Sequence, residues 1–189
     1  EQMGKALRHS QLKDSQHCVL YLDIDQFSLV NEVYDKVNGD QVLLEFSKLL
    51  AQLHGKKSSS ARIEGDGFAV LLLDRSMEQG LQIAEKIRSD IASSSVDIEA
   101  ESVTFTVSIG AAPILEHSPT VDDVLEAARM ATRKAKELGR NQVQVYEEDQ
   151  ALAGAYRQEK SRALESVEQA LATDRFVLRA QPIVQTTIG

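Results

Sequence analysis

The sequence is poor in cysteine, in long apolar stretches and in runs of basic residues. Cys18 is the only cysteine among 189 residues, which excludes a disulfide framework and is typical of a reducing cytoplasm. No apolar run approaches the ~18 residues of a membrane-spanning helix, and no signal peptide is present. The formal net charge is -8, so the cationic surface that nonspecific nucleic-acid binding requires is absent.

These absences limit where the protein can be located and which partners it can bind. We expect a cytoplasmic protein with no nucleic-acid partner and no membrane contact from this chain. Because the sequence stops at Gly189 in the middle of an apolar pattern, we interpret it as a fragment, whose parent can still be membrane-anchored. The two common nucleotide-binding motifs, Gly-x-x-x-x-Gly-Lys-Ser/Thr and strand–GxGxxG–helix, are missing as well.

What is present is a regular alternation of helical and strand patterns. Apolar residues make up 42% of the chain, enough for the core of one sizeable domain and an extension. Asp25 occupies the N-cap position of the first helix after the first strand, and Gly39 interrupts the helical pattern. The expected elements are a strand at 18–25, helices at 26–33 and 42–53, a loop at 55–60, a hairpin at 61–73, a helix at 77–91 that ends at 93–95, a strand at 103–110, a helix from 120 to 138 with a glycine cap at 139, and a strand at 142–146.

The order of these elements predicts an α+β fold with a largely antiparallel central sheet flanked by helices. We expect four segments along the chain. An incoming linker helix covers 1–14, the main domain 15–149 and a second linker helix 150–173, and a new strand begins a further domain at 174–189.

Two acidic segments are candidates for a metal site. Asp23 and Asp25 are two residues apart on one strand and therefore share a face. With Asp66 in the turn of the hairpin they could ligate Mg²⁺, which prefers carboxylates together with substrate phosphates. Each has an alternative interpretation, because Asp25 could cap a helix, Asp23 could be solvated, and Asp66-Gly67 is also a common hairpin turn.

Four further polar residues are candidates for nucleotide binding. Lys136 and Arg140 flank the end of a helix, where they could hold phosphates or merely interact with the helix dipole. Asn31 and Asp40 lie near helix starts, where they could read the edge of a base or only cap the helices.

Taken together, five ordered segments resemble the GGDEF family, the diguanylate cyclase domains of bacterial signalling. The segments are Tyr21-Leu-Asp-Ile-Asp-Gln-Phe27, Asn31 with Asn38-Gly-Asp40, Arg62-Ile-Glu-Gly-Asp-Gly-Phe68, Thr106-Val-Ser-Ile-Gly110 and Ala135-Lys-Glu-Leu-Gly-Arg-Asn141. The resemblance implies a palm-type, nucleotidyl-cyclase-like fold. It also implies a homodimer in which two GTP molecules, assisted by Mg²⁺, become cyclic di-GMP and pyrophosphate.

The resemblance also implies roles for individual residues. Asp23, Asp66 and the Ile24 carbonyl would be metal ligands, with Asp66 as the remaining catalytic acid of a degenerate signature. Asn31 and Asp40 would read guanine, whereas Lys136 and Arg140 would hold phosphates.

Three departures from the family pattern fall at the chemistry. Glu64 replaces the first glycine of the signature, Gly67 replaces its glutamate, and Ser28 stands where a phosphate-facing lysine is usual. A carboxylate about 4 Å from a phosphate costs ~1–4 kcal/mol, so Glu64 is expected to weaken nucleotide binding. The Arg-x-x-Asp product-inhibition motif is also missing from the segment 55–60.

The last segment, Phe176-Val-Leu-Arg-Ala-Gln-Pro-Ile-Val184, resembles the first strand of an EAL domain, with Gln181 as its cyclic di-GMP contact. We therefore expect a regulatory GGDEF domain without cyclase turnover, which binds GTP and Mg²⁺ or a partner and biases an adjoining EAL domain. An active diguanylate cyclase and a ligand-free dimerisation scaffold remain the alternatives.

Overall fold

The structure is a computed structural model that describes residues 1–146, apart from 14, 54, 56, 99–100 and 117. The predicted linker helix at 150–173 and the predicted strand at 174–189, with Gln181, lie outside the described residues. Residues 1–147 belong to one compact unit. None of the helices in the described part combines the length and the hydropathy needed to cross a bilayer.

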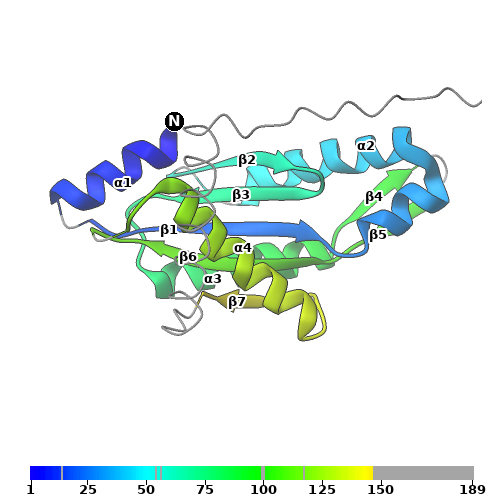
Figure 1. Ribbon diagram of the computed structural model, residues 1–189. Coiled ribbons are helices and arrows are strands. Elements are labelled where there is room, and N and C mark those ends of the chain that lie inside the picture. The colour runs from blue at the N-terminus through cyan, green and yellow to red at the C-terminus, as the bar shows by residue number, and fades with distance from the viewer. Residues whose placement is uncertain (14, 54, 56, 99–100, 117, 147–189) are drawn as a thin grey trace, which may run out of the picture. The chain divides into compact units, whose positions relative to one another are not determined.

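A five-stranded sheet with β1 at its centre organises the domain (Figure 1). β1 pairs in antiparallel fashion with β3 on one side and β6 on the other, and β2 pairs in antiparallel fashion with β3. β7 joins β6 in parallel. The predicted α+β fold with a largely antiparallel sheet is therefore confirmed. The strands are β1 (His17–Ile24), β2 (Ser58–Glu64), β3 (Gly67–Leu72), β6 (Val107–Ile114) and β7 (Val143–Val145).

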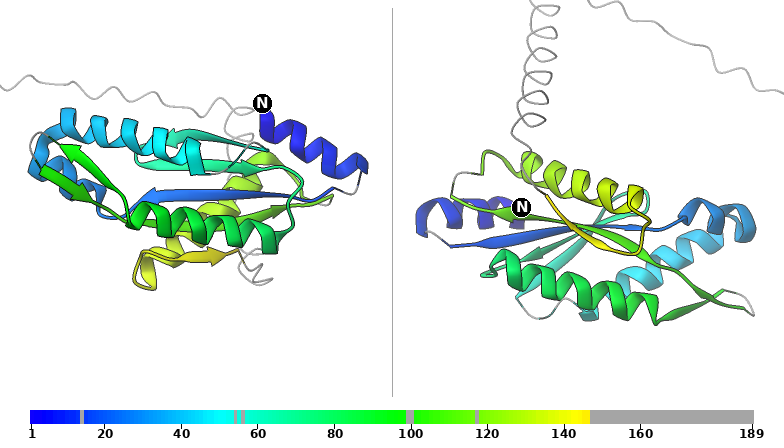
Figure 2. Two further views of the ribbon diagram at one scale, coloured as in Figure 1. Left: turned by 180° about the vertical axis from the view of Figure 1, so that it is seen from behind. Right: turned by 90° about the horizontal axis from the view of Figure 1, so that it is seen from below.

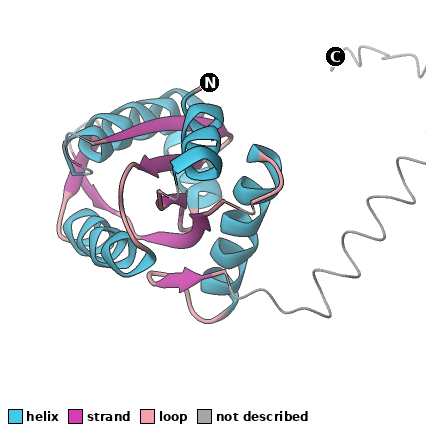
Figure 3. Cartoon of the chain, turned by 90° about the vertical axis from the view of Figure 1, so that its left-hand side faces the viewer, coloured by secondary structure: helices cyan, strands magenta, loops and turns pink. Residues whose placement is uncertain are grey.

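Helices cover both faces of this sheet, as Figures 2 and 3 show. The alternation of side chains along β1 explains the two layers. Its even-numbered residues from Cys18 to Ile24 pack with α2 and α3, and Val19 and Tyr21 pack with α1 and α4. The helices are α1 (Gln2–Lys13), α2 (Phe27–Leu53), α3 (Met77–Ala92) and α4 (Val121–Glu137).

The predicted break at Gly39 is wrong, because α2 continues through it and kinks at Asp35 instead. Asp35 has φ 71° and ψ 176°, and its carboxylate accepts hydrogen bonds from the amides of Val37 (2.8 Å) and Asn38 (3.0 Å). Asp35 thus acts as an N-cap for the second half of α2. Gly39 is buried inside the helix, and a Cβ there would lie 2.0 Å from Asn31 Oδ1.

The prediction that Asp25 caps the first helix is also wrong. Its carboxylate accepts hydrogen bonds from the hydroxyls of Thr106 and Ser108, both at 2.7 Å, and from the Asn141 amide at 3.0 Å. Asp25 is 8% exposed and so ties the end of β1 to β6 and to the turn after α4. Asp25 fits the sequence pattern of an N-cap, but its carboxylate binds donors that are more than 80 residues away in the sequence.

The strand predicted at 103–110 is two strands with a break between them. β5 (Glu101–Thr104) pairs with β4 (Ser95–Ile98) in a separate two-stranded sheet, and β6 begins at Val107. The break coincides with Thr106, whose carbonyl accepts the Asp25 amide at 2.9 Å. β4 is not among the predicted elements and shares only Ser95 with the predicted helix end at 93–95, and β2 starts at Ser58, inside the predicted loop.

The other predicted elements are confirmed with small shifts at their ends. Ser76 caps α3 with a capping box that sequence reasoning missed, and Thr120 caps α4. Gly139, with φ +118°, follows the last turn of α4 in the left-handed conformation that glycine tolerates well.

Candidate functional site

Two carboxylates meet where β1 ends beside the turn between β2 and β3. The register pairs Asp23 with Gly67, which brings the preceding residue, Asp66, next to Asp23. Gly65 enables this turn with φ +51°, and Arg62 Nε donates a hydrogen bond of 2.8 Å to the Gly65 carbonyl. The two acids that the sequence analysis placed in one metal site are therefore neighbours.

Asp23 sits in an electrostatically demanding position. Burial raises the pKa of its carboxyl to about 6, the Asp66 carboxylate adds to the rise, and the Lys136 ammonium opposes it. Lys136 Nζ lies 2.5 Å from Asp23 Oδ1 as an ion pair. The ammonium is therefore the charged partner of this buried carboxylate oxygen.

This donor set fits a magnesium ion. It offers the half-buried carboxylate of Asp23, a second carboxylate on Asp66, and the adjoining Ile24 at the wall of the pocket. Hard oxygen ligands of this kind are the ones Mg²⁺ prefers. The ammonium of Lys136 now supplies the positive charge at this position.

A pocket of about 550 Å³ opens beside the acids, within the range of small-molecule sites. It brings together residues from β1, α2, the hairpin turn and the end of α4. Six predicted site residues other than Asp23 line it, together with Ser28 and two cations that were not predicted. They are Ile24, Asn31, Asp40, Asp66, Lys136 and Arg140, with Lys36 and Arg62 as the additional cations.

The kink in α2 shapes one wall of the pocket. Because Asp35 caps the second half of the helix, the next residue, Lys36, lies at the start of that half and lines the pocket. Asn31 packs against the Gly39 backbone, which has no Cβ to exclude it. No sequence signal would have identified Lys36, because its position depends on a kink that the helical pattern does not reveal.

The end of α4 forms the opposite wall. Arg140 and Asn141 both have positive φ, 65° and 44°, and the Arg140 amide donates to the Ala135 carbonyl at 3.0 Å. The Asp25 carboxylate fixes the same turn by accepting a hydrogen bond from the Asn141 amide. Lys136 and Arg140 thereby line one pocket, and their role as phosphate ligands stays a prediction.

Glu64 does not line the pocket. Its carboxylate lies 2.6 Å from Arg129 Nη2 on α4, and the Arg129 guanidinium in turn stacks 5.3 Å from the centre of the Tyr21 ring. The structure thus places Glu64 in a surface ion pair with Arg129 and not among the residues that line the pocket, and its effect on a bound phosphate stays a prediction.

At Gly67, by contrast, a neighbouring side chain leaves no room for a Cβ atom. A Cβ at this position would lie 2.2 Å from the Tyr21 hydroxyl and 2.9 Å from its ring carbon Cζ. Tyr21 is 4% exposed and packs among the residues between the sheet and α4. The space beside Gly67 is thus occupied by the tyrosine.

The fold and this site define a class of protein. The family description "Diguanylate cyclase, GGDEF domain" matches residues 1–142, so the chain belongs to the GGDEF family. Its GGDEF signature segment is Glu64-Gly65-Asp66-Gly67-Phe68.

Several known proteins are similar to this chain. The uncharacterised protein YhcK of Bacillus subtilis is 35% identical over 147 residues, covering 76% of this chain and 41% of YhcK. The bifunctional diguanylate cyclase/cyclic di-GMP phosphodiesterase MucR of Pseudomonas aeruginosa is 29% identical over 189 residues, covering 100% of this chain and 27% of MucR. The crystal structure of the GGDEF domain of YfiN (TpbB) from P. aeruginosa superposes with a TM-score of 0.73 at 29% identity, covering 77% of this chain and 91% of that one. The chain thus spans less than half of these curated relatives.

Proposed function

We propose that this chain is a regulatory GGDEF domain of cyclic di-GMP signalling, which binds GTP with Mg²⁺ but no longer turns it over. Occupation of its pocket would bias an adjoining EAL domain. The observation that carries this proposal is an asymmetry within the site. The ligand-binding residues converge on one pocket, whereas the signature position of the missing acid, Gly67, is filled by the Tyr21 hydroxyl.

The chemistry of the lining suggests how GTP would be held. Asn31 and Asp40 offer the paired donors and acceptors that a guanine edge requires, and both lie on the α2 wall. Lys136 and Arg140 on the opposite wall would hold phosphates, Arg140 with its fork of donors. Lys36 and Arg62 add positive charge that partly replaces the lysine missing at Ser28.

Asp23, Asp66 and the Ile24 carbonyl would hold the metal. When bound, Mg²⁺ would neutralise phosphate oxygens and the two acids together. Displacement of the Lys136 ammonium from Asp23 would free this lysine for a phosphate, because one cation then replaces another beside the same carboxylate.

Loss of turnover follows from what the turn lacks. One carboxylate at Asp66 remains where the family signature supplies two acidic residues, so the turn contributes less negative charge for metal binding and activation of the attacking hydroxyl. The intact phosphate and base walls support binding without chemistry.

Calorimetric titration of the 189-residue chain with a nonhydrolysable GTP analogue tests this proposal. We expect binding that requires Mg²⁺ and is weakened at least about tenfold, or 1.4 kcal/mol, by Asp66→Ala. Asp122→Ala, which makes the same change on the exposed surface of α4 outside the pocket, should leave the affinity unchanged. A parallel assay with GTP should yield no cyclic di-GMP.

The alternatives correspond to other outcomes of these two assays. Cyclic di-GMP production that is lost in Asp66→Ala would establish an active cyclase, for which the retained Asp23, Asp66, Lys136 and Arg140 are the argument. No binding at millimolar analogue would leave a dimerisation scaffold. MucR, which matches this chain along its whole length, combines both activities of cyclic di-GMP metabolism and supports an EAL partner, with Gln181 as its ligand contact.

A further inference from the structure

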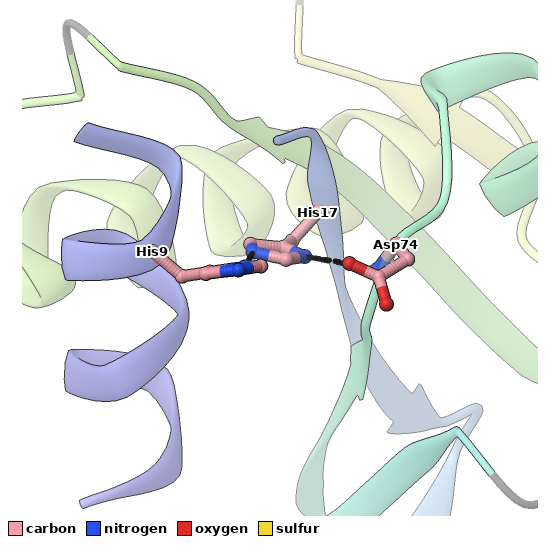
Figure 4. A group of neighbouring side chains, drawn as sticks. All are labelled: His9, His17 and Asp74. Atoms are coloured by element: carbon pink, nitrogen blue, oxygen red, sulfur yellow. Dashed lines mark hydrogen bonds and ion pairs between the residues drawn. The ribbon is translucent and has the colours of Figure 1, made fainter. Parts of the chain in front are cut away.

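Two histidines and an aspartate meet at the end of β1 opposite to the nucleotide pocket, as Figure 4 shows. His17 is the first residue of β1 and is 2% exposed. His9 lies on α1, and its ring stacks on that of His17 with the centroids 5.4 Å apart and the planes 20° from parallel. Asp74 follows β3 on the other side of the His17 ring.

The hydrogen bonds assign the proton of the His17 ring. The Asp74 amide can only donate, and it lies 2.9 Å from His17 Nδ1, so this nitrogen carries a lone pair. The proton of the neutral ring is therefore on Nε2, which lies 3.3 Å from His9 Nδ1 and 3.4 Å from Ser15 Oγ. His9 Nδ1 lies 2.9 Å from Ser15 Oγ, and this hydroxyl can donate to it or accept from it.

This pattern argues against a metal centre, although the residue types would suit one. The amide of Asp74 already occupies one nitrogen of His17, and the other nitrogen carries the ring proton. Asp74 Oδ1 lies 3.9 Å from His17 Nδ1, on the side away from His9. The three groups form a row with the His17 ring in the middle, and their lone pairs do not converge on a common point.

The same pattern has no place for an additional proton on His17. Protonation of His17 at Nδ1 would direct an N–H group at the Asp74 amide. It would also place a buried imidazolium against the stacked His9 ring.

We propose that the His9–His17 pair is an acid-sensitive latch, which holds the C-terminal half of α1 on the sheet while His17 is neutral and releases it when His17 is protonated. The remaining attachment of α1 in this half is modest. Ser10 Oγ donates to the Ile114 carbonyl at 3.3 Å, and Ala6 and Leu7 contact the layer under α4. The histidine pair is therefore a substantial part of the contact.

The surrounding charges favour the neutral state at ordinary pH. The titratable or charged groups described around His17 are His9 from α1, Asp74 and Arg75 after β3, and Lys57 before β2. Burial lowers the pKa of His17, Asp74 opposes the change, and His9 lowers it further. Asp74 is 48% exposed and lies 3.4 Å from Lys57, which limits its influence.

The direction of the pH dependence follows from this lowered pKa. A histidine with a lower pKa in the docked state than its ordinary ~6.5 stabilises docking fully above that value. The stabilisation is lost as pH falls below ~6.5. At pH 5.5, one unit lower, protonation of His17 can weaken docking by up to about tenfold.

Hydrogen exchange of the whole 189-residue chain at pH 7.5 and 5.5, corrected for intrinsic exchange rates, tests the latch. We expect protection of the amides from Leu7 to Leu12 to fall about tenfold or more at pH 5.5. Protection in α3 should stay unchanged, which separates release of α1 from global unfolding. Equal protection of α1 at both pH values would overturn the proposal.

Variants identify the groups responsible. His9→Gln/His17→Gln should make protection of α1 independent of pH, whereas Arg8→Gln, which removes a charge from the adjacent position of α1, should retain the wild-type response. If the double variant does not fold, His9→Gln alone should still reduce the response, because the ring of α1 that stacks on the His17 imidazolium is gone. A full response in whichever of these variants folds would contradict the latch.

Added Zn²⁺ separates the latch from a metal site. At pH 7.5 we expect the metal to leave the exchange of α1 unchanged. A gain in protection that requires both histidines would show that the cluster binds metal and would overturn the proton-only device.

Discussion

At the scale of single residues, the two changes in the signature turn differ in their physical consequences. Glu64 is a change in charge that the fold tolerates, since Arg129 pairs with it at 2.6 Å outside the pocket. Gly67 is a change in shape, since the Tyr21 hydroxyl fills the position that its side chain would occupy. Tyr21 and Gly67 therefore have to be considered as a pair.

This pairing predicts how cyclase activity can be restored. The triple change Glu64→Gly, Gly67→Glu and Ser28→Lys should yield no cyclic di-GMP and a less stable protein, because the new side chain collides with Tyr21. Overpacking of this kind typically costs about 1–3 kcal/mol. Adding Tyr21→Leu to the triple change should recover stability and give measurable synthesis by chromatography of the products.

The control for this prediction is Tyr21→Leu alone, which should produce no cyclic di-GMP since the turn still lacks its second acid. Equal synthesis by the triple variant with and without Tyr21 would show that the tyrosine yields easily, and that the Gly67 position is not blocked.

At the scale of elements, Asp25 joins three segments that are far apart in the sequence. Its carboxylate accepts two hydroxyls of the β5–β6 region and an amide of the turn after α4. The turn that it holds carries Arg140, and the strand that it ends carries Asp23. The connection thus sets the spacing between the acidic and the basic walls of the pocket.

Removal of this carboxylate should be costly. In Asp25→Ala three donors lose their partner, of which the Ser108 hydroxyl is buried, and we expect a loss of about 2–4 kcal/mol in the free energy of unfolding. Urea denaturation followed by circular dichroism measures the change. Asp122→Ala, on the exposed face of α4, should change stability by less than about 1 kcal/mol. Similar losses in both variants would contradict the role given to Asp25.

At the scale of the whole molecule, Cys18 reports on the integrity of the core. It is 0% exposed, burial raises the pKa of its thiol to about 12, and α3 crosses it at Gly80. Because the thiolate is the reactive form, neither access nor ionisation permits reaction in the folded state.

We therefore predict that alkylation of Cys18 by iodoacetamide at pH 8 proceeds only through opening of the core. Gly80→Ala should accelerate it, because the added Cβ would lie 2.7 Å from Cys18 Sγ. The matched variant Gly4→Ala, where the nearest atom is 3.8 Å away on a flexible arginine, should leave the rate unchanged. Rapid labelling of the wild-type protein under native conditions would refute this description of the core.

The sequence by itself determined the α+β class, most of the elements and six of the residues that line the pocket. Asp23, Asp66, Lys136 and Arg140 were predicted from strand ends, a turn and a helix end, and the structure brings them together; their roles in binding stay predictions. Such features are local, because periodicity and turn chemistry act over a few residues.

Contacts between distant segments decided the rest. The Glu64 side chain turns away from the pocket because it pairs with Arg129. The position beside Gly67 cannot hold a side chain because the Tyr21 hydroxyl fills it. The Asp25 carboxylate connects distant segments because its donors are Thr106, Ser108 and Asn141. The kink at Asp35, the hairpin of β4 and β5 and the docking of α1 through His9 are of the same kind. A local pattern in the sequence shows which residues are polar or small. Which residue each of them contacts depends on the sheet, because the sheet brings distant segments side by side.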